Sequence, residues 1–381
     1  TVAARRASRM AKVQEGRGHE GAAPVAANAQ QSALLSLLHT VLLVATSPGY
    51  GNASDTATTH WFTFISMVWG DPSPLYYPTD WVLACFAVWL SMVYVKADGS
   101  PLAAGSVKVY LYGVKKFYSL CNVVVDLKAT SSPMTNAVLG AIRKFSDPVK
   151  RVMPITAEMI YNIASLPLQG WDDEIFQLAC LLGFFFLLRV GEFAETANYP
   201  SGGGGVRQLT MGDLEFFDES NDPITIESEA DVVRARWLHL KVKASKGDQM
   251  WLGCLRLAEA TGRIDCVVQR AARFVLLAGR RGQLHSEPLL QRSSGSVATD
   301  DWFRATLKAV IATLTINGAR VAPAPFNTHS LRAGGATRLF ELGKRPEFIA
   351  MMGRWASDAV LHYVRVADHA LFAGVSSEMA Y

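Results

Sequence analysis

The sequence predicts a mainly helical protein of two parts, with a small antiparallel sheet in the second part. Three observations favour this fold class. Apolar residues recur at helical spacing in most segments after residue 79. Residues 209–217, 236–243 and 249–253 alternate between apolar and polar side chains, as short strands do. Proline and charge gather at 147–154, where we place a linker between the two parts.

Composition sets the broad class of the protein. Half of the 381 residues are hydrophobic and 18% are charged, which allows buried cores and excludes wholesale disorder. The five cysteines show no CxxC spacing, so we expect neither a disulfide framework nor a zinc site, and we expect an intracellular protein. The compartment would be the nucleus in a eukaryote and the cytoplasm or nucleoid in a bacterium.

Residues 1–75 are interpreted as a low-complexity region of uncertain role. Residues 1–30 are rich in alanine and arginine without apolar periodicity, so we expect disorder there. The apolar run at 33–45 favours a packed helix, because it is too short to span a bilayer and follows too long a leader for a signal peptide. Residues 81–95 predict a buried helix capped by Thr79 or Asp80. Its length of about 22 Å falls short of a bilayer core of about 30 Å, so no membrane partner is expected.

Residues 76–150 are predicted to form a helical domain with a basic exterior. Helical spacing covers 106–118, and a second helix lies near 135–145. The whole chain has a net charge of only +4, yet residues 104–153 carry eight basic and two acidic side chains. This local excess is typical of a phosphate-facing surface, although a solvated helix face is the alternative. The candidate DNA-binding residues are Lys108, Lys115, Lys116, Arg143, Lys144, Lys150 and Arg151.

Residues 155–381 are predicted to form a second domain around one apolar helix. A helix at 157–166 precedes an acidic helix start at 171–174 and an apolar run at 178–188. Residues 213–231 hold eight acids and no base, which we interpret as a solvated surface insertion. The glycine run at 201–205 is no P-loop, because no Lys-Ser/Thr pair follows it. Further helices are expected near 264–279, 300–314, 328–342, 346–352 and 357–366.

One of these helices carries a histidine and an arginine on the same face. His329 and Arg332 are three residues apart in a helix that Asn327 or Thr328 would cap and Gly343 would end. Chance alone produces such pairs in a chain of this composition, so this pair by itself indicates little. The small residues at 333–336 favour close packing of the same helix against a neighbour.

A longer set of residues resembles the tyrosine recombinase/integrase superfamily. An arginine follows an apolar helix, a lysine lies at a predicted hairpin tip, an HxxR helix comes next, and a tryptophan precedes a late tyrosine. The set is Arg189, Lys246, His329, Arg332, Trp355 and Tyr363. The resemblance covers about residues 79–368, and its ending is most similar to recombinases of DIRS-like or Crypton-like mobile elements. It implies a helical, SAM-like core-binding domain and an α+β catalytic domain that opens near residues 154–156.

The resemblance implies cleavage and rejoining of DNA without a metal ion or ATP, so no cofactor is expected. Tyr363 would attack a phosphodiester and form a 3′-phosphotyrosyl bond. Arg189 and Arg332 would hold the non-bridging oxygens, and the indole N–H of Trp355 would add a donor. The interval from Trp355 to Tyr363 is eight residues, where many relatives have nine. Tyr381 is a rival nucleophile, but the surrounding motif is missing there.

Proton transfer is implied for the remaining residues. Lys246 suits the general acid that protonates the leaving 5′ oxygen, and Lys243 is an alternative lysine on the preceding strand. His329 suits a general base or a phosphate donor. Glu192 matches the position of an acid that orients the site. The expected partner is double-stranded DNA, held between the two domains in a complex with a homo-tetramer of the chain.

Other functions stay open from sequence alone. A domesticated DNA-binding protein would keep the fold without turnover, and a type IB-like topoisomerase would share the chemistry. A metal-dependent nuclease is poorly supported, because the carboxylate clusters at 172–174 and 300–301 lie at predicted helix starts, where acids stabilise the helix. The target sequence and the direction of the reaction are not encoded in these patterns.

Overall fold

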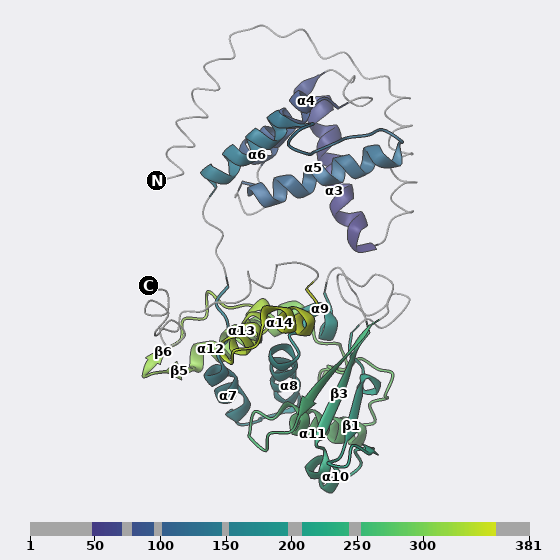
Figure 1. Ribbon diagram of the computed structural model, residues 1–381, viewed down its shortest axis with the longest axis vertical. Coiled ribbons are helices and arrows are strands. Elements are labelled where there is room, and N and C mark those ends of the chain that lie inside the picture. Colours follow the sequence, from purple (N-terminus) through teal and green to yellow (C-terminus); the bar gives the residue numbers. More distant parts are fainter. Residues whose placement is uncertain are drawn as a thin grey trace, which may run out of the picture. The chain divides into compact units, whose positions relative to one another are not determined.

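The computed structural model describes residues 48–70, 78–94, 101–146, 152–196, 208–243 and 253–355, with side chains from residue 56 onward (Figure 1). The chain divides into two compact units, residues 1–149 and 150–381, and each is described by itself. The predictions for residues 1–30, 33–45 and 357–366 lie outside the described residues.

The first unit is a bundle of helices around an aromatic core. Its elements are α3 (Pro48–Phe64), the π-helical turn η1 (Ile65–Trp69), α4 (Asp80–Met92), α5 (Ala104–Leu120) and α6 (Pro133–Phe145). α3 packs on α5, and α4 packs on α6. The indole N–H of Trp61 donates to the Tyr118 hydroxyl at 3.0 Å inside the core. The sequence did not predict α3, so the bundle begins earlier than residue 76.

A carboxylate joins two of these helices. Thr79 caps α4 by accepting a hydrogen bond from the Val82 N–H, as predicted. The Asp80 carboxylate instead caps α6, where it accepts from the N–H groups of Met134 and Thr135 at 2.8 and 3.0 Å. Burial alone would raise the pKa of Asp80, but these bonds and one from the Thr135 hydroxyl outweigh it and lower the pKa overall.

The second unit surrounds one buried helix. That helix, α8 (Trp171–Phe185), contacts α7 (Ala157–Ser165), α11 (Val267–Arg280) and α13 (His329–Glu341). Figure 1 shows α13 and α14 across one end of α8 and the strands to one side of it. The other elements are α9 (Val190–Phe193), η3 (Met211–Asp213), β1 (Leu214–Phe217), β2 (Pro223–Ile224), α10 (Glu229–Arg234), β3 (Trp237–Val242), β4 (Cys254–Glu259), α12 (Asp300–Thr313), β5 (Thr315–Ile316), β6 (Ala319–Arg320) and α14 (Pro346–Gly353).

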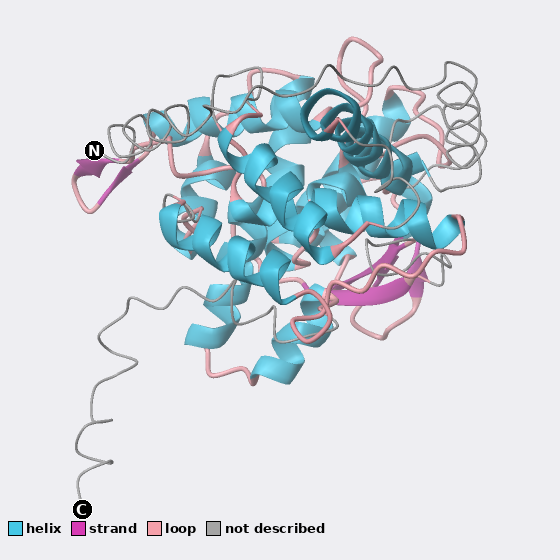
Figure 2. Ribbon diagram, turned by 90° about the horizontal axis from the view of Figure 1, so that it is seen from above, coloured by secondary structure: helices cyan, strands magenta, loops and turns pink. Residues whose placement is uncertain are grey.

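The sheet is antiparallel with the strand order β2-β1-β3-β4. Figure 2 shows the strands in magenta and the helices in cyan. Phe216 pairs with Leu238 in the register of β1 and β3, and both side chains are buried in the core. The β5–β6 hairpin lies outside this sheet. Gly253 is the one described residue of the strand predicted at 249–253. The prediction was wrong at Gly253, because β4 begins at Cys254.

The acidic segment 213–231 is not a surface insertion, and that prediction was wrong. It contains β1, β2 and the first part of α10, and it contributes Phe216 to the core. Asp213 itself is buried. In β1 the side chains alternate, so Leu214 and Phe216 enter the core while Glu215 is exposed, and most of the other carboxylates of the segment lie at the surface. The number of acids alone does not predict this burial, because it depends on where the apolar residues lie between them.

The predicted fold class, mainly helical with a small antiparallel sheet, is confirmed. Most predicted helices after residue 79 are present with ends shifted by a few residues, which is the usual uncertainty of helix boundaries. All five cysteines lie in the described part of the chain and are unpaired. No helix in that part is long and apolar enough to cross a membrane.

Candidate active site

The second unit brings together most of the residues that the sequence singled out. Arg189 and Glu192 follow α8, His329 and Arg332 lie in the first turn of α13, and Trp355 follows α14. Hydrogen bonds and a ring contact link these segments, as described below. Lys246 and Tyr363, and the basic residues Lys150 and Arg151, lie outside the described residues.

A sharp turn after α8 positions Arg189. The helix ends at Phe185 rather than at 188 as predicted, and Leu187 takes a left-handed conformation with φ +50°. Arg189 then begins the short helix α9, where its N–H donates to Glu192 Oε2 at 2.8 Å. The Arg189 guanidinium also reaches Glu192 Oε1 at 3.2 Å. Glu192 is buried, while the Arg189 side chain keeps 23% of its surface exposed and can meet a ligand.

Arg332 is held inside the protein. It has no exposed surface, and its two terminal nitrogens donate to the main-chain carbonyls of Leu187 and Gly353. Its guanidinium carbon lies 4.1 Å from the ring centroid of Trp355, a cation–π contact. Arg332 therefore fastens the turn after α8 to the end of α14. A phosphate could reach it only through movement of the groups that cover it.

Two glycines of α13 allow it to pack closely against Ile155 and the end of α8. A Cβ atom at Gly334 would lie 1.9 Å from the Ile155 carbonyl oxygen, and one at Gly335 would lie 2.1 Å from the Phe184 carbonyl oxygen. Real Cβ atoms essentially never come so near a backbone atom. The predicted close packing of 333–336 is therefore confirmed. It places the first turn of α13 against the end of α8, where Arg332 meets Leu187.

His329 lies at the start of α13 in a positive environment. Its main-chain N–H donates to the side-chain oxygen of Asn327 at 2.8 Å, so Asn327 holds the helix entry. The residue is exposed, yet desolvation by the surrounding protein lowers the pKa of His329. The nearby charge of Arg332 lowers it further, against the opposing effect of Asp300. A lowered pKa favours the neutral imidazole, which can accept a proton.

Lys243 has a structural partner. Its Nζ atom lies 2.8 Å from Asp213 Oδ2 and 3.2 Å from the Thr210 hydroxyl. Asp213 also accepts from the Thr210 N–H at 2.7 Å, so the ion pair fastens the end of β3 to the segment before β1. This engagement weighs against Lys243 as the alternative general acid. The connection from β3 to β4 contains Lys246, which lies outside the described residues.

Sequence reasoning missed an arginine in this site. Arg354 donates from Nη2 to Glu192 Oε2 at 2.7 Å and to the Leu187 carbonyl at 3.0 Å. Its Nη1 donates to the carbonyls of Phe186 and Met352 at 3.3 and 3.2 Å. Burial lowers the pKa of Arg354, although the neighbouring Glu192 opposes this. The signal in the sequence is the GRW motif, in which Arg354 directly precedes Trp355.

The basic residues predicted to bind DNA lie on two helices of the first unit. Lys108, Arg143 and Lys144 are exposed, whereas Lys115 and Lys116 are half-buried on α5. Partial burial lowers the pKa of Lys116. Arg143 and Lys144 lie in the last turn of α6, where cations also stabilise the helix dipole. Their exposure is compatible with both the phosphate-facing surface and the solvated face.

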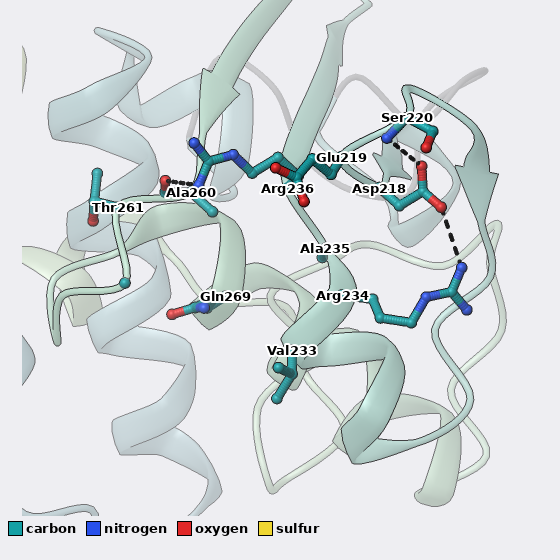
Figure 3. A pocket seen from close by; sticks show the side chains of 11 residues that line it. Asp218, Glu219, Ser220, Val233, Arg234, Ala235, Arg236, Ala260, Thr261 and Gln269 are labelled. Carbon is teal, nitrogen blue, oxygen red and sulfur yellow. Dashed lines mark hydrogen bonds and ion pairs between the residues drawn. The ribbon is translucent and has the colours of Figure 1, made fainter.

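A pocket of 490 Å³ lies at the end of the sheet where β3 begins and β4 ends (Figure 3). It is lined by the turn after β1, the residues before β3 and those after β4. Its arginines are already engaged, because Arg234 bonds Asp218 at 3.2 Å and Arg236 bonds the Ala260 carbonyl at 3.4 Å. None of the predicted site residues lines it. Among the described residues no cluster of three His, Cys, Asp or Glu could hold a metal ion.

Comparisons with known proteins identify the fold. No protein-family model matches the sequence, and no curated protein matches it significantly. Solved structures do match. The XerH site-specific recombinase bound to palindromic difH substrate, a post-cleavage complex, aligns with a TM-score of 0.53 at 14% identity. That alignment covers 87% of this chain and 80% of XerH. The pre-cleavage complex of XerH with difH gives a TM-score of 0.50 with the same identity and coverage.

This chain has the tyrosine recombinase fold. The match extends over most of both chains, so the fold accounts for the helical unit as well as for the unit that holds the arginines. Identity this low shows the fold alone. The likeness to DIRS and Crypton elements stays a prediction.

Proposed function

We propose that the protein is a site-specific DNA recombinase or integrase that acts through a 3′-phosphotyrosyl intermediate. One observation carries the proposal. Arg189, His329, Arg332 and Trp355, which the sequence singled out by order, spacing and family resemblance, lie around the turn after α8 on a tyrosine recombinase fold. Residues that served only local structure would have no reason to converge from three separate segments.

The chemistry follows from the charges of the site. The Tyr363 hydroxyl attacks the phosphorus and loses its proton to neutral His329, the phosphorus–5′ oxygen bond breaks, and Lys246 protonates the leaving oxygen. Arg189 and Arg332 balance the negative charge that gathers on the non-bridging oxygens. The phosphotyrosyl bond conserves the linkage energy, so attack by a new 5′ hydroxyl rejoins DNA without ATP or a metal ion.

DNA binding is assigned to the basic residues of the first unit as well as to the site. Phosphate contacts by lysine and arginine release counterions, so the affinity falls as salt rises. Exchange of strands between two duplexes needs cleavage of all the strands involved, and we therefore propose a homo-tetramer on DNA. Action on chromosomal or element DNA implies an intracellular location.

A covalent adduct tests the proposal. We would incubate the full-length protein with a pool of nicked duplexes of randomised sequence, in which cleavage releases a short strand and traps the enzyme. SDS-resistant complexes are then recovered and their DNA is sequenced. We expect adducts with the wild type and Tyr381→Phe, and none with Tyr363→Phe. Adducts that persist in Tyr363→Phe would exclude Tyr363 as the nucleophile.

One observation favours a second function, that of a DNA-binding protein without turnover. Arg332 has no exposed surface and both its terminal nitrogens bond main-chain carbonyls, so its position suits a structural role. Under the leading proposal, DNA binding must open this part of the site. Retention of DNA in salt-sensitive complexes, without an SDS-resistant adduct from any member of the pool, would favour the silent protein.

A further inference from the structure

Arg354 connects Arg189 and Arg332, the two arginines that are proposed to hold the phosphate. It shares the Leu187 carbonyl with Arg332 and the Glu192 carboxylate with Arg189. Arg354 and Glu192 expose only 8% and 3% of their side chains. A bond between charged groups in such dry surroundings is strong and directional, so the position of each partner depends on the others.

The backbone conformation at Arg354 is independent evidence that its side chain has a specific role. Arg354 follows α14 in the left-handed conformation, with φ +57°. Glycine is the usual residue at such a helix end, and other residues pay roughly 1 kcal/mol for it. Arginine at this position is therefore less favourable for the backbone than glycine would be. Its Nε atom is also buried, with no hydrogen-bond partner among the described residues.

The same helix end is fastened from the sheet. Arg256 of β4 donates to the carbonyls of Met351 and Met352 at 2.5 and 3.3 Å. The residue before Arg354 is equally constrained, because a Cβ atom at Gly353 would lie 1.9 Å from the Trp355 ring. These contacts constrain the chain on the N-terminal side of Arg354, and the Arg354 guanidinium bonds the Phe186 and Leu187 carbonyls of the turn after α8.

We infer that Arg354 is a positioning residue that sets the places of both Arg189 and Arg332 through Glu192 and the Leu187 carbonyl. This inference rests on the proposed function. Without Arg354, Glu192 keeps only Arg189, and Leu187 keeps only Arg332. Each arginine can then shift toward its remaining partner, and the two no longer hold a phosphate at a fixed separation.

Three substitutions at this position separate positioning from folding. Arg354→Ala removes the side chain but keeps the unfavourable φ, whereas Arg354→Gly removes the side chain and relieves the backbone. Arg354→Lys keeps a charge for Glu192 but cannot hold the Phe186 and Leu187 carbonyls at the same time. Arg345→Ala is the matched control, because Arg345 begins the same helix and is 84% exposed in a pair with Glu347.

The first measurement is single-turnover cleavage of a duplex recovered by the adduct capture, with the Kd for the same duplex measured in parallel. We expect Arg354→Ala and Arg354→Gly to form adducts about tenfold to a hundredfold more slowly, the loss typical of one charge-assisted bond. Arg354→Lys should fall between these variants and the wild type. The Kd should change less than about threefold, and Arg345→Ala should cleave as the wild type does.

The second measurement does not depend on activity. In protein labelled with ¹⁵N-arginine, the Arg332 side-chain signals should show slow rotation in the wild type and faster rotation in Arg354→Gly. Wild-type cleavage by Arg354→Gly, or a loss of cleavage matched by an equal loss of DNA binding, would overturn the inference. If the wild type itself forms no adduct, the proposed function fails. The Arg332 signals then decide alone, and unchanged rotation would overturn the positioning role.

Discussion

Substitution of one glycine in α13 should damage the site more than its size suggests. In Gly335→Ala the new methyl group would lie 2.1 Å from the Phe184 carbonyl oxygen and 2.5 Å from the Leu187 side chain. Because a backbone atom cannot rotate away, α13 must move by about 1 Å in a core packed at crystal-like density. Overpacking of this kind costs about 1–3 kcal/mol, and the rigid backbone favours the upper part of that range.

An opposing effect must be subtracted. Alanine is a better helix former than glycine by about 1 kcal/mol, so the net loss should be about 2 kcal/mol. Gly279→Ala measures the opposing effect alone, because Gly279 lies in α11 of the same unit and a Cβ atom there would meet nothing within 4 Å. Gly279→Ala should therefore leave stability unchanged or raise it.

Hydrogen exchange followed by mass spectrometry reads the local stability of α13 and α8 in the full chain. We expect exchange in both helices to rise about thirtyfold in Gly335→Ala, as 2 kcal/mol requires, and to stay constant or slow down in Gly279→Ala. Adduct formation should fall as well, because the shift moves α13, and Arg332 with it, away from its place beside the turn after α8. Exchange in Gly335→Ala as slow as in Gly279→Ala would refute the close approach of α13 and α8.

Three further predictions concern single side chains. Asp80→Ala should destabilise the first unit by about 1–2 kcal/mol through loss of the α6 cap, measured by hydrogen exchange of α6; because the folded pKa of Asp80 is lowered, the wild type should lose this contribution as pH falls below about 4. Asp213→Asn should cost about 1–3 kcal/mol at the end of β3, since Lys243 loses its charged partner; equal unfolding midpoints would contradict it. The lowered pKa of His329 predicts a neutral ring at pH 7, which NMR can measure. Protonation of the ring at a pH below the usual histidine pKa of 6.5 should slow cleavage. A ring that is charged at pH 7 would exclude His329 as the base.

The sequence predicted the parts of the site that depend on order and residue type. The HxxR helix and the arginine after an apolar helix follow from patterns with a fixed period. The turn that joins them does not, because leucine seldom takes the left-handed conformation of Leu187 and no local signal announces it. Arg354 was missed for a related reason, since its importance lies in bonds to residues more than 160 positions away.

The fold shows the same division. Helix α3 escaped prediction because its first half, PGYGNASDT, shows no apolar residues at helical spacing, although Trp61 and Phe64 in its second half lie in the core. The acidic composition of residues 213–231 led to the wrong prediction of a solvated insertion, because Asp213 is a buried ion-pair partner. The spacing of apolar residues predicts which face of a segment is buried. Whether a charged residue is also buried depends on partners from distant segments, which the spacing does not show.

The most direct test of the central claim is the identity of the atom that carries the DNA. Trypsin cleaves after Arg354 and Arg365, so Tyr363 lies in a peptide of residues 355–365. Tandem mass spectrometry of the digested adduct should place a nucleotide, joined through its 3′ phosphate, on Tyr363 in that peptide. A nucleotide on Tyr381, a 5′ linkage, or no modified peptide in an SDS-resistant complex would contradict the account.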